Sequence, residues 1–302
     1  MERPEFDSLL EEVRGFWSPL PDKPEETPER LLSALWHTAA GVPVSVERAA
    51  PQDLPPLDAA AQARLCGLLA RKKSGVPLAH LTGRQAFLGL EFLAGAAALI
   101  PRKETEILGR AALAKLDALA RQRGPLQVLD VCTGSGNLAL AYACYQPAAR
   151  VYASDLCADA LDLARRNLEH LSAGAGLRGR VEFRQGDLLE PFEAPPFLGG
   201  CDFVSCNPPY ISAVRVGQMH REISQHEPRV AFDGGVYGVS VLARLLKQAP
   251  RFLKADGWLG FEVGAGQGAG IVRQLERNPA FCAVETFADA AGEIRAILAR
   301  AA

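Results

Sequence analysis

Hydrophobic residues in the first quarter of the chain recur at the spacing of helices that bury one face. The repeat is carried by Leu31, Leu32, Leu35 and Trp36, and again by Leu65, Leu68 and Leu69. Thr27 and Pro28 precede the first run, and these residue types are typical of a helix N-cap and first turn. The pattern predicts a helical domain over residues 1–75. Because this region has no residues typical of a catalytic site, we expect it to recognise the substrate or to cover the site.

Residues 76–103 have a different pattern. Glycines interrupt the segment VPLAHLTGRQAFLGLEFLAGAAALIP, and no helical period is sustained along it. Short apolar runs separated by glycine are typical of strands joined by a tight turn. We therefore predict that this segment is a β-hairpin linker.

From residue 104 onward, short apolar runs alternate with longer amphipathic stretches. The predicted strands are 126–131, 150–155, 180–185, 201–206, 257–263, 281–287 and 292–298, and the predicted helices include 104–120, 159–171 and 238–253. Such alternation indicates a parallel, doubly wound α/β sheet. The last two runs predict a closing hairpin at one sheet edge. Residues 104–302 are therefore expected to form one seven-stranded α/β domain.

The amino-acid composition mainly excludes classes of protein and kinds of binding site. The 302 residues are 48% hydrophobic and 23% charged, as in ordinary globular proteins. No stretch of about 18 apolar residues is present, so no membrane helix is expected. Seven cysteines without a Cys-x-x-Cys pair indicate reduced thiols and a cytoplasmic protein. The net charge of -2 argues against stable binding to nucleic acid, and the histidines lack the paired spacing of a metal site.

A glycine-rich turn follows the first predicted strand of the sheet. Its candidate cofactor-binding residues are Asp130, Thr133, Gly134 and Gly136. Glycines at this point let the backbone approach a ligand and turn sharply into a helix. The turn lacks the Gly-Lys-Ser/Thr of a phosphate-binding loop and the Gly-x-Gly-x-x-Gly of a dinucleotide site.

Acidic residues stand at the ends of the next two strands. Asp155 can accept hydrogen bonds from both ribose hydroxyls of a nucleoside, and Asp187 can meet an adenine amino group. Either acid alone is more often a loop cap or a solvated charge. Together with the glycine turn they resemble the S-adenosylmethionine site of Rossmann-like methyltransferases.

The fourth strand of the sheet runs into Asn207, Pro208, Pro209 and Tyr210. A planar nitrogen with two N–H donors can be held by the side-chain oxygen of Asn207 and the carbonyl of Pro208. The two prolines stiffen the backbone, and Tyr210 offers a ring face to the acceptor. In isolation this tetrapeptide would be only a strand-terminating turn. Beside a nucleoside-type site it predicts methyl transfer to an amide or amine nitrogen.

The chain resembles the HemK-like protein-(glutamine-N5) methyltransferases from residue 28 onward. The resemblance rests on VPLAHLTGRQAFLG, LIPRKETEIL, VLDVCTGSGNLA, CNPPY, HEPRVAFDGG and AGEIRAIL. It implies a helical domain before a Rossmann-like class I methyltransferase domain. It also implies that the tetrapeptide holds a glutamine side chain, as in the Gly-Gly-Gln motif of peptide chain release factors. By position, Phe87 would pack near the cofactor, and Arg102 and Glu104 would lie near its pocket and contact the substrate.

The motifs leave the acceptor open. Cys132 and His226-Glu227-Pro228 resemble the branch of the family that modifies a ribosomal protein, whereas Glu104-Thr105-Glu106 resembles the release-factor branch. A small-metabolite acceptor is a further possibility. The alternative enzyme is an amino-methyltransferase acting on a flipped nucleobase. A sensor without turnover is disfavoured because it would not need the acceptor tetrapeptide.

Overall fold

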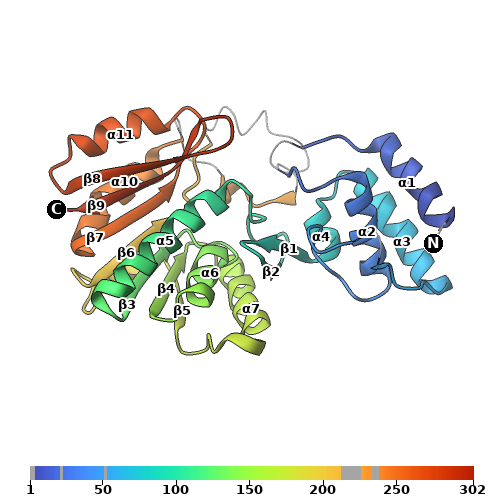
Figure 1. Cartoon of the computed structure of the whole chain (residues 1–302), viewed down its shortest axis with the longest axis horizontal. Helices are drawn as coiled ribbons and strands as arrows, with labels where there is room; N and C mark the ends of the chain where they lie inside the picture. The colour runs from blue at the N-terminus through green and yellow to red at the C-terminus, as the bar shows by residue number, and fades with distance from the viewer. Residues whose placement is uncertain (1–3, 21–22, 51–52, 212–225, 233–234, 236–237) are drawn as a thin grey trace.

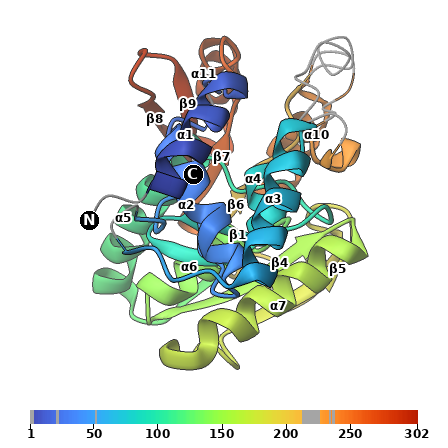
Figure 2. The same ribbon diagram turned by 90° about the vertical axis from the view of Figure 1, so that its right-hand side faces the viewer.

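The computed structural model describes residues 4–20, 23–50, 53–211, 226–232, 235 and 238–302. A small group of helices and a larger sheet domain lie along the long axis, with a short hairpin between them (Figure 1). The two chain ends therefore lie at opposite ends of the molecule. When the view is turned, the helical part stands in front of the sheet (Figure 2).

The N-terminal part is built from α1 (Pro4–Phe16), α2 (Pro28–Ala39), α3 (Ala59–Lys73) and α4 (Leu78–Thr82). Thr27 caps α2, and the Asp58 carboxylate caps α3 by accepting the Ala61 N–H over 2.7 Å. The leucines of the predicted repeat pack together in one core. Its fully or largely buried members include Val13, Leu31, Leu32, Leu35, Leu65, Leu69, Leu78 and Leu81.

The linker differs from the prediction at its start, because residues 78–82 form the short helix α4. Leu78 and Leu81 are three positions apart, so both side chains enter the helical core. The helix ends at Gly83, whose φ of 65° is left-handed. Five residues are too few to display a helical period in the sequence.

The hairpin itself is formed by β1 (Arg84–Phe87) and β2 (Leu90–Leu93), which pair antiparallel. Leu88 and Gly89 connect the strands with φ values of 49° and 80°. Two left-handed residues in succession are the signature of a type I′ turn, which matches the twist of the paired strands.

The main sheet has seven strands in the order β5-β4-β3-β6-β7-β9-β8. Their bounds are β3 (Leu126–Val131), β4 (Ala149–Asp155), β5 (Val181–Gln185), β6 (Cys201–Cys206), β7 (Leu253–Glu262), β8 (Phe281–Ala288) and β9 (Ile294–Ala301). The strands β3 to β7 run parallel, and β9 pairs antiparallel with both β7 and β8. The predicted seven-stranded α/β fold is confirmed, including the closing hairpin at one edge.

Helices cover both faces of this sheet. One hydrophobic core joins α5 (Thr105–Arg123), α6 (Asn137–Tyr145) and α7 (Ala158–Ala175) to the strands, and the other joins α10 (Ser240–Gln248) and α11 (Gly268–Glu276). Short 3₁₀ turns occur at Glu190–Phe192, Arg229–Ala231 and Ala249–Arg251. Among the described helices, none is long and apolar enough to span a membrane.

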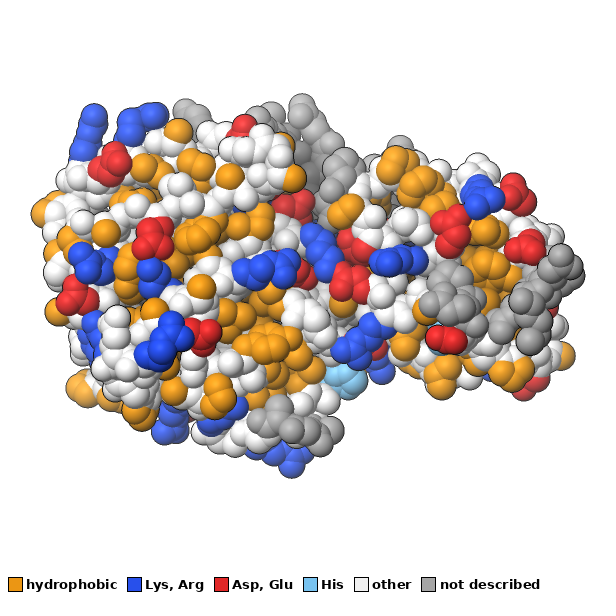
Figure 3. Space-filling view, viewed as in Figure 1, with side chains coloured by type: hydrophobic (Ala, Val, Ile, Leu, Met, Phe, Trp, Pro, Cys, Tyr) orange, Lys and Arg blue, Asp and Glu red, His pale blue; other side chains and the backbone are white. Residues whose placement is uncertain are grey.

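The strand order reverses at β3, whose neighbours are β4 on one side and β6 on the other. In open α/β sheets the carboxyl ends of the strands at such a reversal leave a crevice for a ligand. On the face drawn in Figure 3, basic and acidic side chains are interspersed among hydrophobic ones.

Candidate active site

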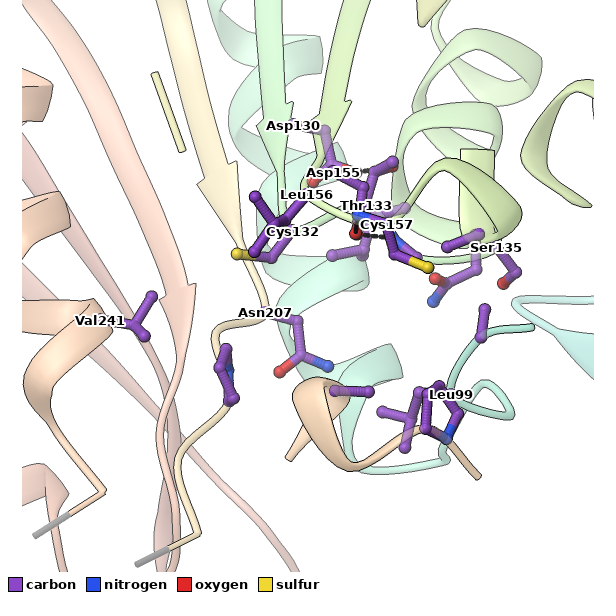
Figure 4. Close-up of a pocket in the computed structure, with 18 of the residues that line it drawn as sticks. Leu99, Asp130, Cys132, Thr133, Ser135, Asp155, Leu156, Cys157, Asn207 and Val241 are labelled. Atoms are coloured by element: carbon purple, nitrogen blue, oxygen red, sulfur yellow. Dashed lines mark hydrogen bonds between the residues drawn. The ribbon is translucent and has the colours of Figure 1, made fainter. Parts of the chain in front are cut away.

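A cavity lies at the carboxyl ends of β3, β4 and β6. Eight residues that the sequence singled out line it: Arg102, Asp130, Thr133, Gly134, Asp155, Asp187, Asn207 and Pro209. Asp130, Thr133 and Asp155 are grouped together, and Asn207 and Leu99 lie on another side of the same space (Figure 4). The fold thus brings the glycine turn, the strand-end acids and the acceptor tetrapeptide to one cavity.

The glycine turn bends through three left-handed residues, Cys132, Gly134 and Gly136, with φ values of 56°, 54° and 80°. A Cβ on Gly134 would meet no atom within 4 Å, so its backbone is open to a ligand. A Cβ on Gly136 would stand 3.1 Å from that of Ala164. Gly136 is therefore required by the turn and by packing against α7, and it does not line the cavity.

The carboxylate of Asp155 is held by the backbone on two sides. Its Oδ2 accepts the Gly134 N–H over 2.8 Å, and its Oδ1 accepts the Cys157 N–H over 2.9 Å. Burial raises the pKa of Asp155, and these backbone hydrogen bonds oppose the shift. The side chain is thereby fixed at the cavity wall, with remaining oxygen lone pairs available to hydroxyl donors.

Asp130 is a buried acid on the same wall. It accepts hydrogen bonds of 2.6 Å from the hydroxyls of both Thr133 and Ser205. Burial nevertheless raises the pKa of Asp130 to about 6. A cation bound in the cavity would favour the ionised form of this side chain.

Asp187 is partly exposed and pairs with Arg244 of α10 over 2.6 Å. Arg244 also lines the cavity, so the pair connects the segment after β5 to α10. No sequence motif points to Arg244, because it belongs to an ordinary amphipathic helix 57 residues further along the chain.

Asn207 follows β6 directly and lines the cavity. Its Nδ2 donates to the hydroxyl oxygen of Thr105, the first residue of α5, over 3.1 Å. This hydrogen bond occupies the amide nitrogen and leaves Oδ1 to accept from another group. Pro209 also lines the cavity, whereas Pro208 is buried.

Tyr210 is not among the residues that line the cavity, so its ring contact with the acceptor stays a prediction. Tyr210 is half-buried, and desolvation together with the nearby charge of Glu262 raises the pKa of its hydroxyl well above its usual range. Its carbonyl accepts from Gln267 Nε2 over 3.1 Å. The sequence spacing identified the tetrapeptide but did not determine the direction of its last side chain.

Of the other residues predicted at the site, Arg102 lines the cavity, whereas Glu104 and Phe87 do not. Arg102 lines the cavity and pairs with the buried Glu227 over 2.5 Å, and Glu227 also accepts the Ile100 N–H over 2.9 Å. Glu104 is the N-cap residue of α5 and does not line the cavity. Phe87, expected near the cofactor, is fully buried in the core against Phe92 because β1 turns this face toward the sheet domain.

Several lining residues escaped the sequence analysis. Four of them lie within or next to the motifs that the sequence identified, namely Ser135, Asn137, Leu156 and Cys157. Leu99, Pro228 and Ala231 lie in motifs that were quoted without a role at the cavity. The others come from segments with no local signal, namely Ala97, Ala98, Val241 and Arg244.

The chemistry of the cavity fits a nucleoside that carries positive charge. Asp155 offers carboxylate oxygens to hydroxyl donors, and the open backbone at Gly134 leaves room for close approach. Asp130 can add negative charge at the same wall, whereas the charge of Asp187 is balanced by Arg244. These features suit the ribose and the sulfonium and ammonium groups of S-adenosylmethionine.

Known proteins match this chain over most of its length. A family model described as a methyltransferase domain matches residues 128–227. The release factor glutamine methyltransferase of Moorella thermoacetica is 36% identical over 80% of each chain. That of Xylella fastidiosa is 38% identical over 81% of this chain and 84% of its own. That of Geobacter sulfurreducens is 33% identical over 90% of this chain and 87% of its own.

A solved structure shares the fold at low identity. The hMettl16 catalytic domain in complex with the MAT2A 3′UTR hairpin 6 matches 82% of this chain and 83% of its own, with a TM-score of 0.52 and 14% identity. The curated relatives confirm the resemblance found in the motifs, and the protein is an S-adenosylmethionine-dependent methyltransferase. The chain belongs to the family of release factor glutamine methyltransferases.

Proposed function

We propose that this protein methylates the side-chain amide nitrogen of a glutamine in a peptide chain release factor. The observation that carries the proposal is the hydrogen bond from Asn207 Nδ2 to Thr105. It leaves the Asn207 oxygen to accept an N–H from a primary amide. The names of the relatives, all release factor glutamine methyltransferases, support the same acceptor.

The residues divide into a cofactor side and an acceptor side. Asp155 would bind the ribose hydroxyls, and the backbone at Gly134 would lie against the amino-acid portion. S-adenosylmethionine supplies an electrophilic methyl group on a positively charged sulfur. Asn207 Oδ1 and the Pro208 carbonyl would accept the two N–H groups of the glutamine amide. An amide nitrogen is a poor nucleophile, so this positioning supplies much of the rate enhancement, and the proton leaves to solvent after transfer.

The helical part is proposed to select the protein substrate. Its own core is separate from both cores of the sheet domain. The described residues that line the cavity all lie beyond residue 96, which supports a role for the helical part in contacting a protein that presents its glutamine to the site. The seven cysteines are free thiols, which supports the cytoplasmic location that we also propose.

The identity of the methyl acceptor is tested by offering the protein several classes of candidate substrate in parallel. Purified protein and methyl-labelled S-adenosylmethionine are incubated with a release factor, ribosomal proteins, nucleic acid or a small-molecule extract. Label is expected in the release factor, at the glutamine of its Gly-Gly-Gln motif by peptide mass spectrometry. A release factor with that glutamine changed to alanine is the matched control and should take no label. Labelling of another pool alone would refute the proposal.

A further inference from the structure

Asn167 is a fully buried polar residue of α7, and none of the quoted motifs contains it. Its Oδ1 accepts the backbone N–H of Leu93 over 2.6 Å, and its Nδ2 donates to the carbonyl of Leu93 over 3.2 Å. The same Nδ2 donates to the carbonyl of Ser135 over 3.0 Å. One N–H opposite the oxygen and two carbonyls opposite the NH2 determine the orientation of this amide. The side chain of Asn167 thus binds the backbone of two segments that are far apart in the chain.

These two segments form two walls of the cofactor cavity. Ser135 belongs to the glycine turn and lines the cavity. Leu93 is the last residue of β2, and the chain continues from it into residues 97–99, which also line the cavity. Ser135 and Leu99 border this space from different directions (Figure 4). Asn167 does not line the cavity itself, but it connects one wall to the other.

The apolar contacts at this junction are small. Ala98 packs with Ala160 and Leu163 of α7 in a cluster that is separate from the two larger cores of the sheet domain. Alanine side chains bury little area, and apolar contact has no preferred direction. A hydrogen bond needs a narrow range of distance and angle, so the paired bonds to Leu93 fix both the place and the rotation of the backbone there. Asn167 therefore supplies the directional contact between the two walls.

We propose that Asn167 is a positioning residue for S-adenosylmethionine, which holds the glycine turn and the segment after β2 at the spacing that the cofactor needs. It acts through the Ser135 carbonyl on one side and through the backbone of Leu93 on the other. The role concerns cofactor binding, so it holds for any methyl acceptor and does not depend on the proposed release-factor substrate.

Calorimetry with the cofactor separates this role from a general structural one. Asn167→Ala is expected to raise the dissociation constant of S-adenosylmethionine about tenfold, the size of one lost hydrogen bond. Asp202→Ala is the matched control, because Asp202 is also fully buried and accepts the backbone N–H of Gln127 over 2.9 Å near the start of β3, away from the cavity. The control should unfold at lower urea concentration but bind the cofactor within twofold of wild type. Unchanged affinity in Asn167→Ala, or an equal loss in Asp202→Ala, would overturn the proposal.

Asn167→Asp tests the contact with the glycine turn by itself. A carboxylate still accepts the Leu93 N–H but offers no N–H to the Ser135 carbonyl. We expect cofactor affinity to fall at least as far as in the alanine variant. Affinity near that of wild type would show that the bond to Ser135 is dispensable and would contradict the proposal.

Amide hydrogen exchange in the wild type gives a test that needs no variant, so the proposal is decided even if neither change at Asn167 yields folded protein. The N–H groups of Leu93 and Gln127 both donate to a buried side chain, but only the partner of Leu93 is also bonded to the glycine turn. Saturation with S-adenosylmethionine should slow exchange at Leu93 more than at Gln127. Equal slowing at both amides would reflect general stabilisation alone and would count against a positioning role for Asn167.

Discussion

The backbone N–H of Gly134 donates to Oδ2 of Asp155 over 2.8 Å and ties the glycine turn to the end of β4. Movement of either residue alone would break this hydrogen bond. The carboxylate that would meet the ribose and the backbone that would meet the amino-acid portion are thus fixed before the cofactor arrives. Such preorganisation lowers the ordering cost of binding.

Replacing Asp155 should therefore weaken cofactor binding. We expect Asp155→Ala to raise the dissociation constant of S-adenosylmethionine about 10- to 100-fold, the size of a hydrogen bond to a charged group. Asp155→Asn keeps one oxygen acceptor and should lose less. Isothermal titration calorimetry on both variants measures the difference. An unchanged affinity in the alanine variant would remove Asp155 from the binding site.

Cofactor affinity should also depend on pH through Asp130. In the free protein the pKa of Asp130 is raised to about 6 by burial. A bound cation lowers that pKa, so binding releases a proton in the window around pH 6, and affinity rises as pH increases through it. We expect a gain of about tenfold between pH 5 and 7. Asp130→Asn, which cannot ionise, should flatten this dependence. An equally steep profile in that variant would assign the proton to another group.

The ion pair of Arg102 and Glu227 should matter for stability. Glu227 has no exposed side-chain surface, and it also holds the Ile100 N–H. Glu227→Ala leaves a largely buried guanidinium without its carboxylate, which typically costs about 3–5 kcal/mol of unfolding free energy. Glu227→Gln keeps the backbone hydrogen bond and should cost less. Urea unfolding followed by circular dichroism gives both values, and a loss below about 1 kcal/mol for the alanine variant would contradict this role.

The sequence predicted the strands more completely than the helices. The run at 126–131 matches β3 residue for residue, because a buried parallel strand is a continuous apolar run between breaks. Helix α11 was missed, since Gly266, Gly268 and Gly270 dilute its pattern and only a few side chains anchor it. A Cβ on Gly268 would stand 2.5 Å from that of Ile294, so this glycine reflects close packing against β9.

Residues of the site could be predicted where a sequence motif lies at the end of a predicted strand. Asp130, Gly134 and Asp155 needed only the rule that ligands bind at the carboxyl ends of parallel strands. Arg244 was not predictable, because its contact with Asp187 arises from packing between segments far apart in the chain. Spacing also carries no information on side-chain direction, so the absence of Tyr210 from the cavity lining could not be predicted.

The most discriminating prediction concerns Asn207 itself. Asn207→Ala removes the side-chain oxygen that would orient the acceptor amide. Loss of one such positioning hydrogen bond in a site shielded from water lowers turnover about 10²–10³-fold. The dissociation constant of S-adenosylmethionine should change much less, because Asp155 and the glycine turn remain. Single-turnover kinetics with the release factor and calorimetry with the cofactor separate the two effects.

Asn207→Asp tests the same role through charge. The variant keeps an acceptor oxygen at the cavity but replaces the NH2 that now donates to Thr105. An ionised aspartate beside the positively charged sulfur would stabilise the bound cofactor before transfer, since opposite charges attract strongly where water is excluded. We therefore expect tighter cofactor binding together with slow methyl transfer. Near-normal turnover in Asn207→Ala would show that the Pro208 carbonyl suffices to hold the acceptor, and the central role assigned to Asn207 would then be wrong.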